Sequence, residues 1–377
     1  MLSSPRPAQP SGRLTWLGRS TLPAMVKRGW GSSTVLAFLA AAATAAAQMG
    51  LGYGLGIVVW VPDQPDAADA AWAAGLAWTV FVAAVAVVVG ATVGDRSAGN
   101  VYSGGLARLS GRVTLVVSAA LGGCVTIPLV AVPAHRVRIV DNFAPDLLAG
   151  TYAAAGVVLG LAVALFALAS RAISSNVIAT ASFLWALALV AVSTAGDRIE
   201  VTHLGVWRFT EAGPIWRSFY VPGALVMLGG ALLIGGLASF PAAGRGAGRL
   251  GVTISGAAGP AIVAVAYGLA APRPGHATVE QLSALHTSPY MVLAGLVGSG
   301  LVAAAGSAPA RRSRAGRPAA APAPPVSTPS TNVPDGLTPS AGRRATTLPS
   351  ASASAVSATA RVPPASRAEP SDEWRRR

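Results

Sequence analysis

Eight long stretches of this sequence contain no Asp, Glu, Lys, Arg or His, and they constrain the fold more than any other feature. They cover residues 35–60, 70–94, 113–134, 147–169, 174–195, 219–240, 250–271 and 289–306. Since an α-helix rises about 1.5 Å per residue, about 20 apolar residues cross the roughly 30 Å hydrocarbon core of a bilayer. Lipid offers the backbone no hydrogen-bond partner, so each stretch should be a helix. The sequence therefore predicts an all-α polytopic transmembrane helix bundle of about eight spans.

The composition excludes most soluble folds. Hydrophobic residues make up 53% of the 377 residues and charged residues only 11%, whereas soluble domains carry roughly 25% charged residues. A membrane β-barrel would show short segments of alternating polarity, which these stretches lack. The net charge of +14 does not predict nucleic-acid binding, because the bases flank the apolar stretches or lie in the tail and do not form a face with interleaved aromatic residues.

The loop charges predict the orientation. Near the spans, 15 basic residues lie on the side of the N-terminus and 6 lie on the other side. Because cytoplasmic loops carry the excess of Lys and Arg, both termini are expected in the cytoplasm of a bacterial plasma membrane. The first span has small residues that resemble a signal-peptide cleavage site, but its apolar run is longer than a typical signal core, so we expect it to be retained.

The chain divides into three regions. Residues 1–33 form a basic cytoplasmic segment, residues 34–306 form the transmembrane domain, and residues 307–377 form a Pro-, Ala- and Arg-rich tail. The tail has too few hydrophobic residues to offset its ordering entropy, so a disordered cytoplasmic tail is expected. Besides the lipid bilayer itself, anionic lipid is a candidate partner of the four bases that follow the last span, although these could also serve only as a topology signal; they are Arg311, Arg312, Arg314 and Arg317.

Three pairs of segments suggest a parallel four-plus-four internal repeat. Residues 32–37 resemble residues 174–179, at an offset of 142. Gly111-Arg112 resembles Gly248-Arg249, at an offset of 137, and the Leu-Ala-Gly runs at 148–150 and 293–295 are 145 apart. If the repeat is real, the third and seventh spans are equivalent.

These two spans supply the candidate solute site. Both combine Gly and Pro within the span, and helices interrupted in this way can turn freed backbone groups toward a ligand. The alternative is that these residues serve only packing or bending. The candidate residues are Ser118, Gly122, Gly123, Thr126, Pro128, Ser255, Gly256, Gly259, Pro260 and Tyr267.

No catalytic, cofactor-binding or metal-binding residue is predicted. The spans lack ionisable groups of the kind that proton relays need, and the single cysteine, Cys124, lies in an apolar run. The four histidines fall in predicted outer loops with no helical metal-binding spacing. The longest outer loop, 196–218, alternates β-branched and aromatic residues with polar ones, which favours a short hairpin on the membrane surface. Four aromatic residues near span ends are expected to anchor the chain at the headgroups: Trp60, Trp72, Trp216 and Tyr220.

The runs at 176–185, 281–285 and 289–295 resemble those of uncharacterised multi-pass membrane proteins of high-G+C bacteria. That resemblance covers the eight spans without the tail and implies no activity. Two functions therefore stay open: a permease-like protein for a neutral or weakly polar solute, or a non-catalytic cell-envelope or assembly protein. An enzyme is the less favoured reading.

Overall fold

The computed structural model describes residues 30–63, 67–99, 105–137, 144–195, 201–205, 221–245, 249–271 and 279–306, and all regular elements within these ranges are helices. They are α1 (Trp30–Gly54), α2 (Ala68–Ala98), α3 (Gly105–Gly123), α4 (Thr126–Ala134), α5 (Pro145–Ala169), α6 (Arg171–Ala195), α7 (Val221–Gly244), α8 (Arg249–Ser255), α9 (Ala258–Leu269) and α10 (Val279–Gly306). With α3 and α4 taken together, seven of these helices are long and apolar enough to cross a membrane. The predicted span 250–271 is not one of the seven, because it consists of two short helices, α8 with 7 residues and α9 with 12. The chain is a multi-pass helical membrane protein, as predicted.

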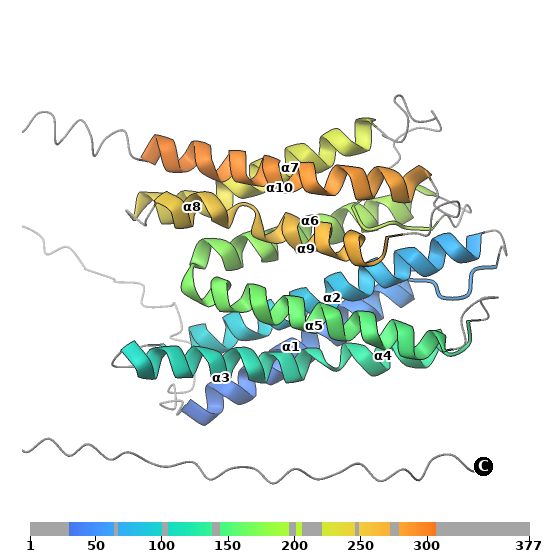
Figure 1. Cartoon of the computed structure of the whole chain (residues 1–377), viewed down its shortest axis with the longest axis horizontal. Coiled ribbons are helices and arrows are strands. Elements are labelled where there is room, and N and C mark those ends of the chain that lie inside the picture. The colour runs from blue at the N-terminus through green and yellow to red at the C-terminus, as the bar shows by residue number, and fades with distance from the viewer. Residues whose placement is uncertain are drawn as a thin grey trace, which may run out of the picture. The chain divides into compact units, whose positions relative to one another are not determined.

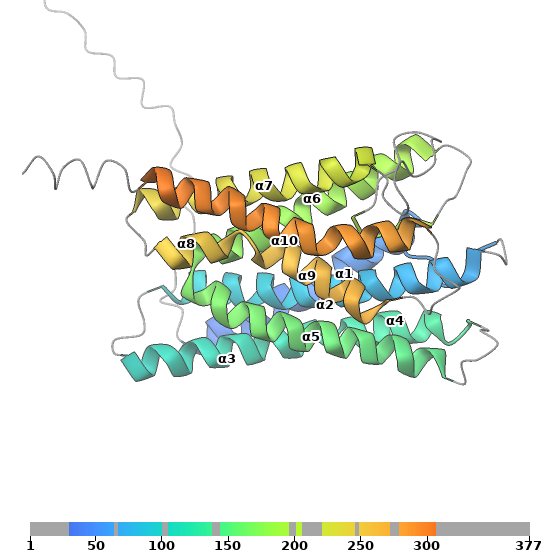
Figure 2. The ribbon, with the colours of Figure 1, turned by 45° about the horizontal axis from the view of Figure 1, so that its top comes forward.

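The helices run along a common direction and α2 lies in the middle of them (Figure 1, Figure 2). Helices α1, α3 and α5 pack directly on α2 and complete the first half of the bundle. In the second half, α10 packs on α7, α8 and α9, and α6 packs on α7 and α9. In the most apolar part of each helix, 89% of the residues of α2 are buried but only 22% of those of α7, so α2 is enclosed by protein while α7 faces outward.

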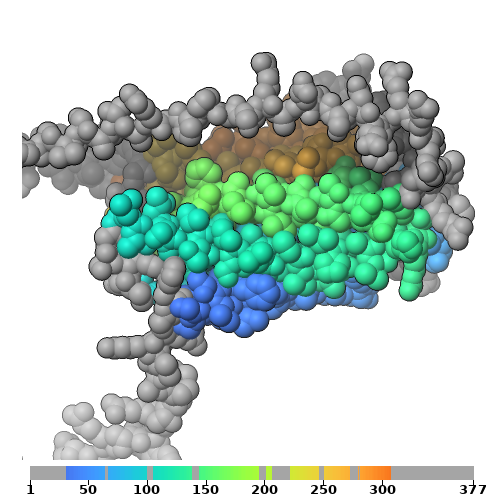
Figure 3. Space-filling model, turned by 60° about the horizontal axis from the view of Figure 1, so that its bottom comes forward, coloured from blue at the N-terminus to red at the C-terminus, as the bar shows by residue number. Residues whose placement is uncertain are grey.

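The outer surface of the first half is apolar. Figure 3 shows α1, α3, α4 and α5 side by side on one face. Exposed side chains of α3, α4 and α5 include Leu109, Val117, Leu121, Val132, Val158 and Phe166. A face of this composition, on helices of spanning length, is suited to contact with lipid tails.

Within each half, glycines bring helix backbones into direct contact. A Cβ added to Gly156 of α5 would lie 2.5 Å from the carbonyl oxygen of Val80 in α2, and one added to Gly298 of α10 would lie 2.0 Å from that of Leu232 in α7. Such close approaches let membrane helices pack without the hydrophobic effect. Wherever a Cβ added to a described glycine would come within 3.0 Å of a backbone atom, that atom belongs to the same half.

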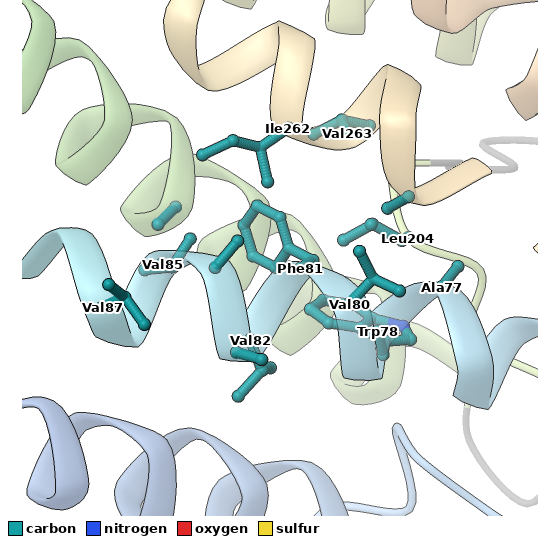
Figure 4. Packing of buried hydrophobic residues seen from close by; sticks show 14 of the residues in the cluster. Ala77, Trp78, Val80, Phe81, Val82, Val85, Val87, Leu204, Ile262 and Val263 are labelled. Carbon is teal, nitrogen blue, oxygen red and sulfur yellow. The ribbon is translucent and has the colours of Figure 1, made fainter. Parts of the chain in front are cut away.

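The boundary between the halves is built differently. It is formed mainly by α2 and α5 on one side and α6 and α9 on the other. Figure 4 shows Phe81 of α2 pointing toward Ile262 of α9, with Val263 next to it. All three side chains are buried. The halves therefore meet mainly through bulky apolar side chains, whereas each half is held internally by backbone contacts. Hydrogen bonds also cross the boundary, from Tyr152 to Leu269 O, from Trp185 Nε1 to Gln48 Oε1 and from Gln281 Nε2 to Ala70 O.

Three span boundaries differ from the predicted ones by more than five residues. Helix α3 begins at Gly105, eight residues before the predicted start at residue 113. Helix α1 ends at Gly54 and not near residue 60, because Gly56 adopts a positive φ of 66° and the next two amides turn back to Gly52 O. Helix α10 begins ten residues before the predicted start at residue 289 and continues through Pro289. The Ser288 hydroxyl donates to Leu285 O, the carbonyl that a residue with an N–H at position 289 would have used. His286, predicted in a loop, consequently lies on a helix.

Trp60 and Trp72 are not headgroup anchors, contrary to the prediction. Both are buried, with ring centroids 5.2 Å apart in an edge-on contact. Trp60 Nε1 donates to the hydroxyl of Tyr53, which donates to Leu129 O in α4. That carbonyl lacks its helical donor because the residue four positions on is Pro133. Trp216 and Tyr220 lie outside the described residues.

We expect Tyr53→Phe to lower the free energy of unfolding by about 1–2 kcal/mol, because the change leaves both Leu129 O and Trp60 Nε1 without a partner. Unfolding of the purified protein by titration with a denaturing detergent measures the difference. Tyr290→Phe removes a hydroxyl from a side chain that is 55% exposed and serves as the control. Equal stability of the two variants would contradict the proposed relay from Trp60 to Leu129.

Candidate functional site

The third and seventh spans are both interrupted, each four residues before a proline. The third span breaks at Cys124–Val125, between α3 and α4, and Pro128 is the third residue of α4. The seventh breaks at Gly256–Ala257, and Pro260 is the third residue of α9. Proline has no N–H and its ring clashes with the carbonyl four residues earlier, so both breaks have the same cause.

At the first break, Cys124 O accepts a hydrogen bond from Ile127 N, which is three residues further on instead of the four of a regular α-helix. At the second break, Gly256 packs directly on α10. A Cβ on Gly256 would lie 2.0 Å from Gly295 O, and a Cβ on Gly295 would lie 2.2 Å from Gly256 O. The two backbones thus contact each other on both sides, and Pro260 is buried beside them.

The five predicted residues of the third span mainly hold α3 and α4 in the first half. Ser118 donates to Thr34 O in α1 at 2.7 Å, Gly122 packs on Phe38 O of α1, and Gly123 packs on Val87 of α2. Thr126 is fully buried and its hydroxyl has no hydrogen-bond partner. Pro128 is exposed on the outside of the bundle.

The five predicted residues of the seventh span lie in the second half. The Ser255 hydroxyl donates to Val252 O within α8, and the Tyr267 hydroxyl donates to Leu204 O. Gly256 and Pro260 line the contact with Gly295 of α10, and Gly259 packs on α6.

The structure does not bring these two groups together. α3 and α4 pack on α1, α2 and α5, whereas α8 and α9 pack chiefly on α6, α7 and α10. Among the described helices, α2 and α5 contact both interrupted spans and lie between them. The ten residues therefore form two separate groups, one on each side of the central helix.

The second group contains two residues that the candidate list omits, Asn176 and Thr180 of α6. Asn176 Oδ1 accepts a 2.8 Å hydrogen bond from the N–H of Gly259, which in an unbroken helix would donate to Ser255 O. A Cβ on Gly259 would lie only 2.2 Å from Thr180 Oγ1, so the hydroxyl faces α9 across the helix interface. Both side chains are buried, and neither Asn176 Nδ2 nor Thr180 Oγ1 has a hydrogen-bond partner.

The equivalent place in the first half is less polar. At the offsets of the predicted repeat, Asn176 corresponds to Thr34, Thr180 to Phe38 and Gly259 to Gly122. The Thr34 hydroxyl is already paired, since it donates to Gly31 O. Gly122 does pack on Phe38, as Gly259 packs on Thr180. The repeat itself stays a prediction, and only its second half carries the polar pair.

The described part of the long outer loop, residues 201–205, packs into the bundle and forms no strand, while the rest of the predicted hairpin lies outside the described residues. Leu204 is fully buried, and Gly205 turns the chain with a φ of 70°. Trp78 Nε1 donates to Thr202 O, while Tyr267 donates to Leu204 O. His203 is 7% exposed, so it is not in a wet loop as the sequence suggested.

The described residues contain no group of three or more His, Cys, Asp and Glu side chains that could hold a metal ion. His135 Nδ1 lies 3.5 Å from Asp146 Oδ2, between the end of α4 and the start of α5. Where the second interrupted span contacts α6, the side chains offer hydrogen-bonding groups that carry no formal charge. Comparison with protein families, with curated proteins and with solved structures finds no match to this chain.

Proposed function

We propose that this chain is a permease-like protein for a neutral or weakly polar solute, with its solute site at the break between α8 and α9. The observation that carries the proposal is the break between α8 and α9, within a predicted span, beside buried hydrogen-bonding side chains without partners. Interrupted spans of this kind provide ligand-facing polar groups at membrane depth in transporters.

The construction of the two halves is consistent with movement between them. Each half is held internally by glycine–backbone contacts, whereas the boundary consists mainly of apolar side chains and few hydrogen bonds, such as the one from Tyr152 of α5 to Leu269 O of α9. We place both termini in the cytosol of a bacterial plasma membrane, because Arg96, Arg112, Arg171 and Arg249 lie near the helix ends of the N-terminal side. The alternative, an envelope or assembly protein, rests on loops and a tail outside the described residues.

Pro260→Ala is expected to lower solute flux on the order of tenfold without lowering stability. Alanine supplies an N–H to Gly256 O and allows α8 to continue into α9, which removes the interruption. Liposomes containing the full chain can be shocked with glycerol, urea or mannitol, and solute entry followed by light scattering. Pro241→Ala, at an exposed proline within the unbroken α7, is the control. The permease proposal fails if the wild-type chain accelerates the entry of none of these solutes.

A further inference from the structure

We infer that Asn176 and Thr180 of α6, together with the start of α9, form the binding site for a small uncharged solute that carries hydroxyl or amide groups. The inference rests on the proposed permease function and names the substrate class of the same site.

The two side chains form one surface. They are four residues apart on α6, so they lie on the same face of the helix. Among the buried side-chain atoms without a partner in the described residues, Asn176 Nδ2 and Thr180 Oγ1 are the two that share one helix face a turn apart. Thr180 is nine residues from the start of α6, about 14 Å along a helix, which places it near the middle of the hydrocarbon core.

The orientation of Thr180 is the second indication of a ligand. Buried threonines can satisfy their hydroxyls on their own helix, as Thr79 does at Gly75 O and Thr92 at Val88 O. In the described residues Thr126, Thr180 and Thr287 are buried threonines whose hydroxyls have no partner. Thr180 could bond Asn176 O in the same way, but its hydroxyl faces Gly259 and stays without a partner. Leaving a buried hydroxyl unpaired costs about 1–3 kcal/mol. Of these three threonines, Thr180 is the one that lies a helical turn from a second unpartnered polar group, Asn176 Nδ2.

The chemistry of the site selects an uncharged ligand. Asn176 Nδ2 can only donate a hydrogen bond, which disfavours a cation beside it. An anion would require free amides at the start of α9, but the Gly259 N–H is bonded to Asn176 and Pro260 has none. A solute oxygen can accept from Nδ2, and a solute hydroxyl or amide can also pair with Thr180 Oγ1, which both donates and accepts.

Thr180→Val tests the site, because valine keeps the shape that packs on Gly259 and removes only the hydroxyl. We expect the solute concentration for half-maximal flux of radiolabelled glycerol, urea or mannitol into liposomes to rise at least tenfold. The thermal unfolding midpoint should be unchanged or higher, since a buried unpaired hydroxyl is lost. Thr92→Val, whose hydroxyl is already paired within α2, should change neither flux nor affinity.

The outcomes separate the site from the function. If wild-type flux is present and Thr180→Val transports with unchanged affinity, or loses flux only together with stability, the site is wrong although the permease stands. If no flux occurs, the proposed permease function is wrong. The site can then be tested without transport, by measuring how fast N-ethylmaleimide alkylates a Cys124→Ser/Thr180→Cys variant. Slower alkylation in glycerol, urea or mannitol, but not in choline or acetate, supports the site; equal rates in all of them overturn it.

Discussion

Gly256→Ala should lower the free energy of unfolding by about 3 kcal/mol, the upper end of the range for an overpacked core. The added Cβ would lie 2.0 Å from Gly295 O and 2.4 Å from Ser299 Oγ, and the backbone carbonyl cannot move aside without shifting α10. Because α10 is also held against α7 at Gly235 and Gly298, the strain would spread through the second half. Detergent-titration unfolding of the purified chain measures the loss.

Gly300→Ala provides a matched control on α10. Its added Cβ would meet Thr253 Cγ2 at 3.6 Å, an ordinary van der Waals contact, so stability should stay within about 0.5 kcal/mol of wild type. If Gly256→Ala is as stable as Gly300→Ala, the direct backbone contact between the α8–α9 break and α10 does not exist in solution.

Trp78→Ala should cost about 3–5 kcal/mol, the usual range for truncating a buried aromatic residue. Trp78 is 1% exposed, lies 5.0 Å from the ring of Trp185 and 6.0 Å from that of Phe81, and holds Thr202 O through its Nε1. Its loss removes both the aromatic packing of α2 on α6 and the hydrogen bond that holds Thr202 O in the segment 201–205.

Thermal unfolding checks the size of this effect, and the reactivity of a cysteine placed at Leu204 checks the release of the segment. Phe166→Ala, at a side chain that is 67% exposed on the outer face of α5, should leave both measurements near their wild-type values. A cysteine at 204 that reacts equally fast with and without Trp78 would show that Trp78 does not hold the segment.

The spans could be predicted from the sequence because a single property, the absence of charge over a membrane thickness, specifies them. All eight predicted stretches contain helix, and the interruptions follow from Pro128 and Pro260. A proline alone does not determine where a helix breaks, however, because three others lie within continuous helices: Pro133, Pro241 and Pro289. The carbonyls freed by Pro133 and Pro289 are paired by Tyr53 and Ser288, and the first of these pairings joins residues 76 positions apart. No local sequence pattern predicts a contact between residues so far apart in the chain.

The position of each helix in the bundle could not be predicted either. α2 and α7 are both apolar all round, yet one is enclosed and the other faces outward. In lipid, neither position requires a polar face, so no periodicity distinguishes them. The candidate site was predicted in part: Gly256, Gly259 and Pro260 were identified from the Gly and Pro pattern, whereas Asn176 and Thr180 were missed. Their four-residue spacing within a charge-free span was the available signal.

The enclosure of α2 has a consequence for how the chain is made. During synthesis α2 enters the membrane before α6 and α9 exist, so the side that later receives Phe81's partners first faces lipid tails. A helix that ends up in the protein interior must therefore be as hydrophobic as one that stays in contact with lipid. We therefore expect the first half to be compatible with the bilayer before the second half is inserted.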